Sequence, residues 1–117
     1  MTPETARRFA SDWIDAWNRH DLDAILSHYS EAVTFVSPFA IKLLSAPDGV
    51  VQGLPALRKY FQIGLATYPD LHFDLHHVAV GVQSVVLIYR SVKNLLAAET
   101  MVLDDQSKVV RVLAHYA

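Results

Sequence analysis

The chain has 117 residues, of which 52% are hydrophobic and only 19% are charged, and its net charge is −2. We expect a single domain over 1–117 from this length, with a ligand cavity or a subunit interface to accommodate the excess of apolar residues. The absence of cysteine excludes disulfides and thiolate metal sites, and the interspersed charges offer no basic stripe of the kind that nucleic-acid binding requires.

The beginning of the chain shows helical periodicity. Thr2-Pro3 is a helix start signal, because a hydroxyl residue caps the helix and proline suits its first position. Phe9, Trp13 and Trp17 then recur every fourth residue, which places them on one face. The pattern predicts a helix that ends near Arg19.

A second helix is expected directly after the first. Asp21 is its predicted cap, and its apolar residues fall at helical spacing: Leu22, Ile25, Leu26 and Tyr29. A short strand over 33–36 follows, and Ser37-Pro38 ends it.

Residues 39–53 show no clear period and contain Pro47, Asp48 and Gly49, so we expect a long loop there. Apolar residues return to helical spacing over 54–68, with a proline in the first turn and another just beyond the end. The first half of the chain therefore predicts three helices and one strand.

The second half changes to a period of two. Four runs of strand length are rich in β-branched and aromatic residues: Leu71–Val80, Ser84–Val92, Leu96–Leu103 and Lys108–Tyr116. Short turns between them predict antiparallel hairpins. Several of the runs are apolar on both faces, so we expect helices on one face of the sheet and a second subunit on the other.

Local motifs accompany this order of elements: Trp13-Ile14-Asp15-Ala16-Trp17, Asp21-Leu22-Asp23-Ala24-Ile25, Tyr29, Val33-Thr34-Phe35, Ser37-Pro38-Phe39 and Gly53. From about Thr5 to the C-terminus the chain resembles the SnoaL-like branch of the nuclear transport factor 2-like superfamily. The resemblance implies an α+β cone-shaped roll of cystatin-like topology, with three helices packed on a strongly curved, mostly antiparallel sheet and a ligand pocket at the wide mouth. Relatives include ketosteroid isomerases, polyketide cyclases, dehydratases, epoxide hydrolases and binding domains, so the fold alone does not give the function.

The resemblance to ketosteroid isomerases can be followed residue by residue. Their general-base aspartate falls on Ser37, and a serine without an adjacent base cannot remove a carbon-bound proton at neutral pH. Their oxyanion-hole tyrosine falls near Trp13, and their second oxyanion donor, a carboxylic acid, falls on Glu99. A supporting tyrosine matches Tyr29, and a pocket-lining position matches Tyr116. The resemblance therefore argues against the ketosteroid isomerase mechanism and leaves Glu99 as the main catalytic candidate.

Glu99 is the only ionisable residue in the apolar run 95–103. Strand alternation places it on the face of three apolar residues, where a carboxylate must be paired, hydrogen-bonded or protonated. It is therefore a candidate pocket acid or base. The alternatives are simple exposure or a salt bridge with Arg90 or Arg111 on a neighbouring strand.

Histidines cluster in the first run of the second half. His72, Asp74 and His76 alternate and suggest a metal site, but polar residues in alternation with apolar ones are also typical of a half-solvated strand, and we predict no metal. Unless a bulge intervenes, His77 falls on the apolar face, as a core residue or a pocket residue. His115, near the end of the last run, is a second candidate for catalysis.

Aromatic residues supply most of the predicted ligand-binding set, because core and pocket wall are continuous in a cone. The set is Trp13, Trp17, Tyr29, Phe35, Ser37, Phe39, Tyr60, Phe61, His77, Tyr89 and Tyr116. We predict no cofactor, because the sequence has no phosphate-binding glycine loop.

Three functions remain open from the sequence. The chain could be a cofactor-independent isomerase, cyclase or dehydratase that uses Glu99 on a small hydrophobic molecule, a non-catalytic binder of such a molecule, or a dimerisation module with an incidental cavity. We expect a homodimer through the outer sheet face in each case. No apolar run suits a membrane span or a signal peptide, so we also expect a cytoplasmic protein without membrane contact.

Overall fold

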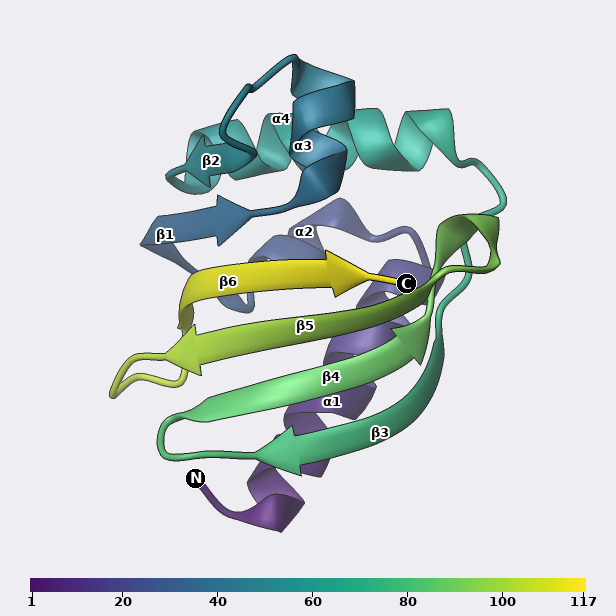
Figure 1. The fold of residues 1–117 in the computed structure, drawn as a ribbon. Helices are drawn as coiled ribbons and strands as arrows, with labels where there is room; N and C mark the ends of the chain where they lie inside the picture. Colours follow the sequence, from purple (N-terminus) through teal and green to yellow (C-terminus); the bar gives the residue numbers. More distant parts are fainter.

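A computed structural model describes all residues 1–117. The α-helices all lie in the first half of the chain together with two strands, and four further strands of the same six-stranded sheet make up the second half (Figure 1). The elements are α1 (Pro3–Asn18), α2 (Leu22–Leu26), β1 (Tyr29–Val36), α3 (Pro38–Leu44), β2 (Val50–Gln52), α4 (Leu54–Thr67), β3 (Asp74–Val80), β4 (Ser84–Arg90), the 3₁₀ turn η1 (Val92–Asn94), β5 (Leu96–Leu103) and β6 (Val109–Tyr116). No helix is both long enough and apolar enough to cross a membrane.

The strands lie in the order β2-β1-β6-β5-β4-β3. Neighbouring strands are antiparallel except β1 and β6, which are parallel. The sheet is curved, and α1 lies behind β3, β4 and β5 in the view of Figure 1. The predicted α+β fold of helices on a strongly curved, mostly antiparallel sheet is confirmed.

The helix α1 covers the inner face of the sheet through its aromatic residues. The Thr2 hydroxyl accepts a hydrogen bond from the Thr5 backbone N–H at 3.1 Å, which starts the helix as expected. Trp13, which is 1% exposed, lies against Phe73 and Tyr89 with ring centroids 5.9 and 5.4 Å away. Aromatic contacts of this kind stabilise the core beyond simple apolar burial.

The segment predicted as a long loop is instead the helix α3 followed by the short strand β2. Ser37 ends β1 and at the same time caps α3, because its Oγ accepts a hydrogen bond from the Phe39 N–H at 3.2 Å and Pro38 takes the first helical position. The turn back to the sheet needs Gly49, whose φ is +70° and whose added Cβ would lie 2.9 Å from the Ser37 carbonyl oxygen. The prediction of three helices and a loop is therefore wrong in this region.

Further boundaries differ from the prediction. The strand β1 begins at Tyr29 rather than Val33, and β4 ends at Arg90 rather than Val92, where the turn η1 begins. The second helix ends at Leu26 rather than near Tyr29, because Tyr29 begins β1 and pairs with Val109 of β6. The strand β3 begins at Asp74 rather than Leu71. The backbone groups of Leu71 and Phe73 form hydrogen bonds with the side chains of His20 and Asn18 instead of with a neighbouring strand.

Two side chains hold that segment in place, one at the end of α1 and one in the turn that follows it. The Asn18 side chain donates to the Phe73 carbonyl oxygen at 2.9 Å and accepts from the Phe73 N–H at 2.7 Å. The His20 ring nitrogen Nε2 donates to the Leu71 carbonyl oxygen at 2.8 Å. These side chains satisfy backbone hydrogen-bonding groups that a neighbouring strand would otherwise satisfy, so the segment stays extended although it does not belong to the sheet.

The outer sheet face is the one turned away from α1. A bulge between Leu75 and His77 shifts the register of β3, so that His77 pairs with the outward-facing Ile88 and is exposed. The prediction that His77 lies on the apolar face is therefore wrong. His115 is also exposed, and it pairs with Ala98 on this same face.

Candidate functional site

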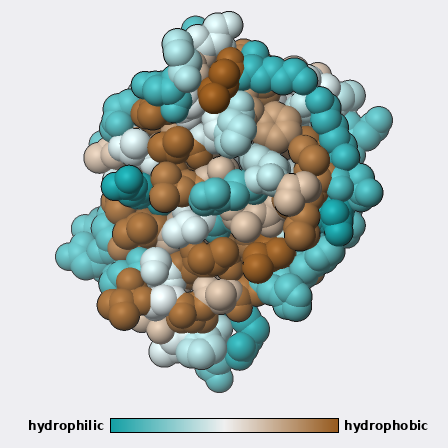
Figure 2. Space-filling view, viewed as in Figure 1, coloured by the Kyte–Doolittle hydropathy of each residue, from teal (hydrophilic) through white to brown (hydrophobic).

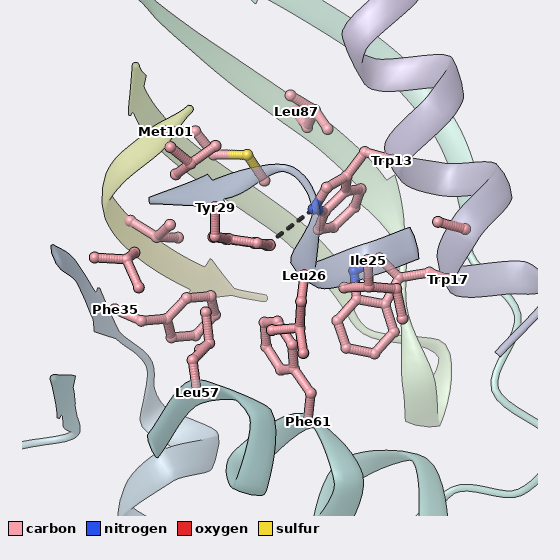
Figure 3. Packing of buried hydrophobic residues seen from close by; sticks show 14 of the residues in the cluster. Trp13, Trp17, Ile25, Leu26, Tyr29, Phe35, Leu57, Phe61, Leu87 and Met101 are labelled. Atoms are coloured by element: carbon pink, nitrogen blue, oxygen red, sulfur yellow. Dashed lines mark hydrogen bonds between the residues drawn. The ribbon is translucent and has the colours of Figure 1, made fainter. Parts of the chain in front are cut away.

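A hollow of about 60 Å³ lies between the inner sheet face and the helices α1, α3 and α4. Several predicted residues line it: Trp13, Trp17, Phe35, Phe39, Tyr60, Phe61, Tyr89, Glu99 and Tyr116. Figure 3 shows how Trp17, Phe35 and Phe61 converge from α1, β1 and α4. A space of this size admits several waters or a small organic group, and it is well below the roughly 300–1,000 Å³ of sites for drug-sized ligands.

Glu99 is the one carboxylate that lines the hollow. It projects from β5 onto the inner face and is only 3% exposed. Its Oε1 accepts a hydrogen bond from the Tyr89 hydroxyl, whereas its Oε2 is buried and has no partner. Arg90 and Arg111 contribute to none of the ion pairs of the chain, so the alternative of a salt bridge to Glu99 is wrong.

The apolar surroundings change the acidity of this carboxyl group. Burial raises the pKa of Glu99 from its ordinary value of 4.5 to about 7, and the hydrogen bond from Tyr89 opposes the shift without cancelling it. Both the acid and the carboxylate are therefore populated near neutral pH. A group in this state can remove a proton and return it, as general acid–base catalysis requires.

The tyrosines beside Glu99 remain neutral hydrogen-bond donors. Burial raises the pKa of Tyr60 to about 12, and burial together with the charge of Glu99 raises the pKa values of Tyr89 and Tyr116 well above the ordinary value. No second charged side chain lines the hollow. The chemistry available there is that of one carboxyl group and several phenols.

Trp13, Tyr29 and Ser37 have structural hydrogen bonds. The Trp13 Nε1–H donates to the Tyr29 hydroxyl at 2.9 Å (Figure 3), so it is not free to donate to a ligand. Tyr29 and Ser37 are buried but do not line the hollow. The Ser37 Oγ caps α3 and accepts from the Tyr60 hydroxyl at 3.4 Å.

His77 and His115 do not reach the hollow either, because both lie on the outer face. The His115 Nδ1–H donates to the Ala98 carbonyl oxygen at 3.2 Å. His72 Nε2 lies 3.3 Å from Asp74 Oδ1 on the surface, and no group of three His, Cys, Asp or Glu side chains is arranged to hold a metal ion.

Seven lining residues were not in the predicted set: Leu43, Gly64, Tyr68, Leu71, Phe73, Ser91 and Val92. The alternation of Leu71 and Phe73 with polar neighbours was a usable signal for an inward face. Ser91 and Val92 follow β4 at a turn, where no periodic pattern marks the side that faces inward.

The Trp17 indole is a second polar group without a partner. Trp17 is 6% exposed and lines the hollow, and its Nε1–H is buried with no hydrogen-bond acceptor. An unpartnered buried donor is costly, by about 1–3 kcal/mol. Together with Glu99 Oε2, it gives the hollow two buried polar atoms that have no hydrogen-bond partner.

Comparison with known proteins agrees with this architecture. A SnoaL-like protein of unknown function from Burkholderia thailandensis E264 is 41% identical, with a TM-score of 0.94 over 100% of this chain and 98% of that chain. The fold is shared with an NTF2-like protein of unknown function from Burkholderia pseudomallei K96243, which is 13% identical, with a TM-score of 0.78 over 100% of this chain and 92% of that chain. It is also shared with SalBIII, an epoxide hydrolase/cyclase-like enzyme of salinomycin pyran ring formation, which is 16% identical, with a TM-score of 0.76 over 97% of this chain and 92% of that chain.

No curated protein matches the sequence. The model of the SnoaL-like domain family matches residues 10–116, which is nearly the whole chain. The chain belongs to the SnoaL-like domain family.

Proposed function

We propose that the hollow binds a small, largely apolar molecule and that Glu99 transfers a proton on it without a cofactor. The observation that carries this proposal is the buried Oε2 of Glu99, which lines the hollow and has no partner. A ligand group that approaches this oxygen would supply the missing hydrogen bond or give up a proton to it. The reaction class would be that of an isomerase, cyclase or dehydratase.

The proton transfer can be written with the residues of the hollow. The Glu99 carboxylate removes a proton from the carbon beside a ligand carbonyl, which leaves an enolate. The Glu99 carboxyl group then returns a proton to the same carbon or to another carbon of the enolate. Tyr89 keeps Oε1 occupied by its hydrogen bond and so directs the proton to Oε2. The fold shared with an epoxide hydrolase/cyclase-like enzyme is consistent with this class of chemistry.

Exchange of the α-protons of cyclohexanone in D₂O, followed by NMR, tests this function on a single-ring ketone. The wild-type protein should accelerate the exchange, and the rate should rise with pH through about 7 as Glu99 becomes a carboxylate. Glu99→Gln should lower the protein-dependent rate by about 100-fold, as expected when a general base is lost. The control is Glu31→Gln, which removes an exposed carboxylate of β1 and should accelerate the exchange as much as the wild type does. Equal rates for Glu99→Gln and wild type would refute the assignment.

Non-catalytic binding in the hollow is the second candidate function. It is favoured by Ser37, which stands where ketosteroid isomerases have their base and which here caps α3. Under this function cyclohexanone would change the fluorescence of Trp13 and Trp17, which line the hollow, and its exchange rate would match that in buffer.

We also propose that a second copy of the chain covers the outer sheet face. Ile88 pairs with Ala98 there, and Val86 and Leu113 lie on either side of Thr100 through the pairing of β4, β5 and β6. Figure 2 shows hydrophobic residues gathered on this side of the molecule and hydrophilic ones around its rim. Opposite charges stand at the edges of this face, with Asp74 on β3 and Arg111 on β6, so two copies could pair them around an apolar centre. The cytoplasmic location stays a prediction from the sequence.

Sedimentation velocity at micromolar concentration tests the homodimer. The wild type should sediment as a dimer, and Ile88→Lys should sediment as a monomer, because a charge at the centre of the interface would lose its hydration. Val82→Lys is the control, since Val82 is 93% exposed in the turn before β4 and lies outside the apolar centre. A monomeric wild type would contradict the proposal.

A further inference from the structure

The wall of the hollow is aromatic on most sides and carries a single charge. Ten of its 16 lining residues are tryptophan, tyrosine or phenylalanine, and they come from α1, α3, α4, the sheet and the segments beside them. Glu99 is the only carboxylate among the lining residues, and no lysine, arginine or histidine lines the hollow. An anionic ligand would therefore meet a negative charge there and no compensating positive one.

The charge of Glu99 has no counter-charge within the molecule. None of the salt bridges of the chain includes Glu99. The Tyr89 hydroxyl donates to Oε1, and because Tyr89 stays neutral, this hydrogen bond leaves the negative charge uncompensated. Oε2 is buried and has no hydrogen-bond partner. In its carboxylate form, Glu99 therefore lacks both a hydrogen bond and an opposite charge at this oxygen.

An ammonium ion would supply both of the missing interactions. It donates a hydrogen bond and brings a positive charge, whereas an alcohol or an amide brings only the hydrogen bond. Aromatic rings also attract cations, tryptophan most strongly, and the attraction grows where water is excluded. Trp13 and Trp17 are both buried and line the hollow. The aromatic wall thus favours a cation as the partner of the carboxylate.

Folding has already removed Glu99 from water. It is 3% exposed, and burial raises its pKa to about 7, so the charged form is disfavoured in the folded chain. A cation that enters the hollow loses only its own hydration, and it relieves the cost of the buried carboxylate. Alkyl groups on the nitrogen pack against the aromatic wall. The volume of about 60 Å³ limits the ion to a few non-hydrogen atoms.

We propose that the hollow also binds small alkylammonium ions, whose N–H donates to Glu99 Oε2 and whose alkyl groups lie against the aromatic side chains. This inference rests on the proposed binding in the hollow and adds a charged class of ligand to it. An ammonium ion at Oε2 prevents Glu99 from removing a proton from a ketone. Such an ion is therefore a competitor of the proposed reaction.

Trimethylammonium and tert-butanol test this inference, because each carries three methyl groups and one hydrogen-bond donor and only the first is charged. An NMR titration at pH 8, where Glu99 is mostly a carboxylate, would follow the indole N–H signals of Trp13 and Trp17. The wild type should bind trimethylammonium about tenfold more tightly than tert-butanol. Glu99→Gln should lose this preference, and Glu31→Gln, which removes an exposed carboxylate, should keep it.

The exchange of cyclohexanone separates this inference from the proposed function. Trimethylammonium should slow the protein-dependent exchange more than tert-butanol does at the same concentration. If the wild type binds both probes equally, or binds neither, while the exchange still depends on Glu99, the inference is wrong and the proposed function stands. If trimethylammonium binds through Glu99 and no exchange occurs, the inference stands and the proposed catalysis fails. A preference for trimethylammonium that persists in Glu99→Gln refutes the inference, because the cation is then held elsewhere.

Discussion

Replacement of Glu99 by glutamine should raise the free energy of unfolding at pH 8 by about 3 kcal/mol. The same replacement should abolish most of the decrease in the free energy of unfolding that the wild-type protein shows between pH 5 and pH 8. Glutamine keeps the shape of the protonated side chain and can still accept the hydrogen bond from Tyr89. In the wild-type protein the buried carboxyl must lose its proton at pH 8 in surroundings that disfavour its charge. The variant has no such charge to bury.

The direction of this pH dependence follows from proton binding. The pKa of Glu99 is about 7 in the folded chain against an ordinary value of 4.5, so the folded state holds the proton more tightly than the unfolded state. The stability that this proton provides is fully present below pH 4.5, and it is lost as the pH rises through about 7. The difference of pKa corresponds to about 3 kcal/mol.

Urea unfolding at pH 5, 6, 7 and 8 and at one protein concentration would measure this effect. The control Glu31→Gln removes an exposed carboxylate and should follow the wild-type curve at each pH. If the free energy of unfolding of Glu99→Gln falls with pH as steeply as that of the wild type, Glu99 does not have the raised pKa that acid–base catalysis near neutral pH needs.

Asn18→Ala should lower the free energy of unfolding by about 3 kcal/mol. The Asn18 side chain satisfies both the N–H and the carbonyl oxygen of Phe73, and alanine would leave both backbone groups without a partner. Phe73 lines the hollow and packs on Trp13, so the loosened segment would also disturb the wall. Chemical denaturation at pH 6 would measure the loss.

The control for this prediction is Arg19→Ala, one residue further along the chain. It breaks two exposed ion pairs, to Asp15 and Asp21, and should leave the midpoint of unfolding nearly unchanged. If Asn18→Ala is no more destabilising than this control, the two hydrogen bonds to Phe73 do not hold the segment.

Periodicity correctly predicted the helices and strands whose hydrophobic pattern extends over many residues. The face of α1 with Trp13 and Trp17 is buried as expected, and strand alternation placed Glu99 on the inner face of β5. These predictions depend only on residues of the same helix or strand. A regular helix or strand carries such a pattern over its whole length, so single residues could be assigned to a face.

The failures come from interactions between distant segments. His77 was misplaced because a bulge in β3 changes the alternation, and nothing in its own run of residues marks the bulge. The helix α3 was missed because it is short and depends on Ser37, which also ends a strand. Asn18 binds a residue far along the chain, so no local pattern revealed its role.

The parallel pairing of β1 with β6 has a consequence for how the protein is made. The strand β6 lies in the middle of the sheet, between β1 and β5, so the sheet cannot form completely until residues 109–116 have left the ribosome. The hairpins of β3, β4 and β5 can form earlier, because their partners are neighbours in sequence. Until β6 arrives, the edges of β1 and β5 that pair with it stay uncovered in the nascent polypeptide. Chaperone dependence during synthesis and slow refolding would follow from this topology rather than from low final stability.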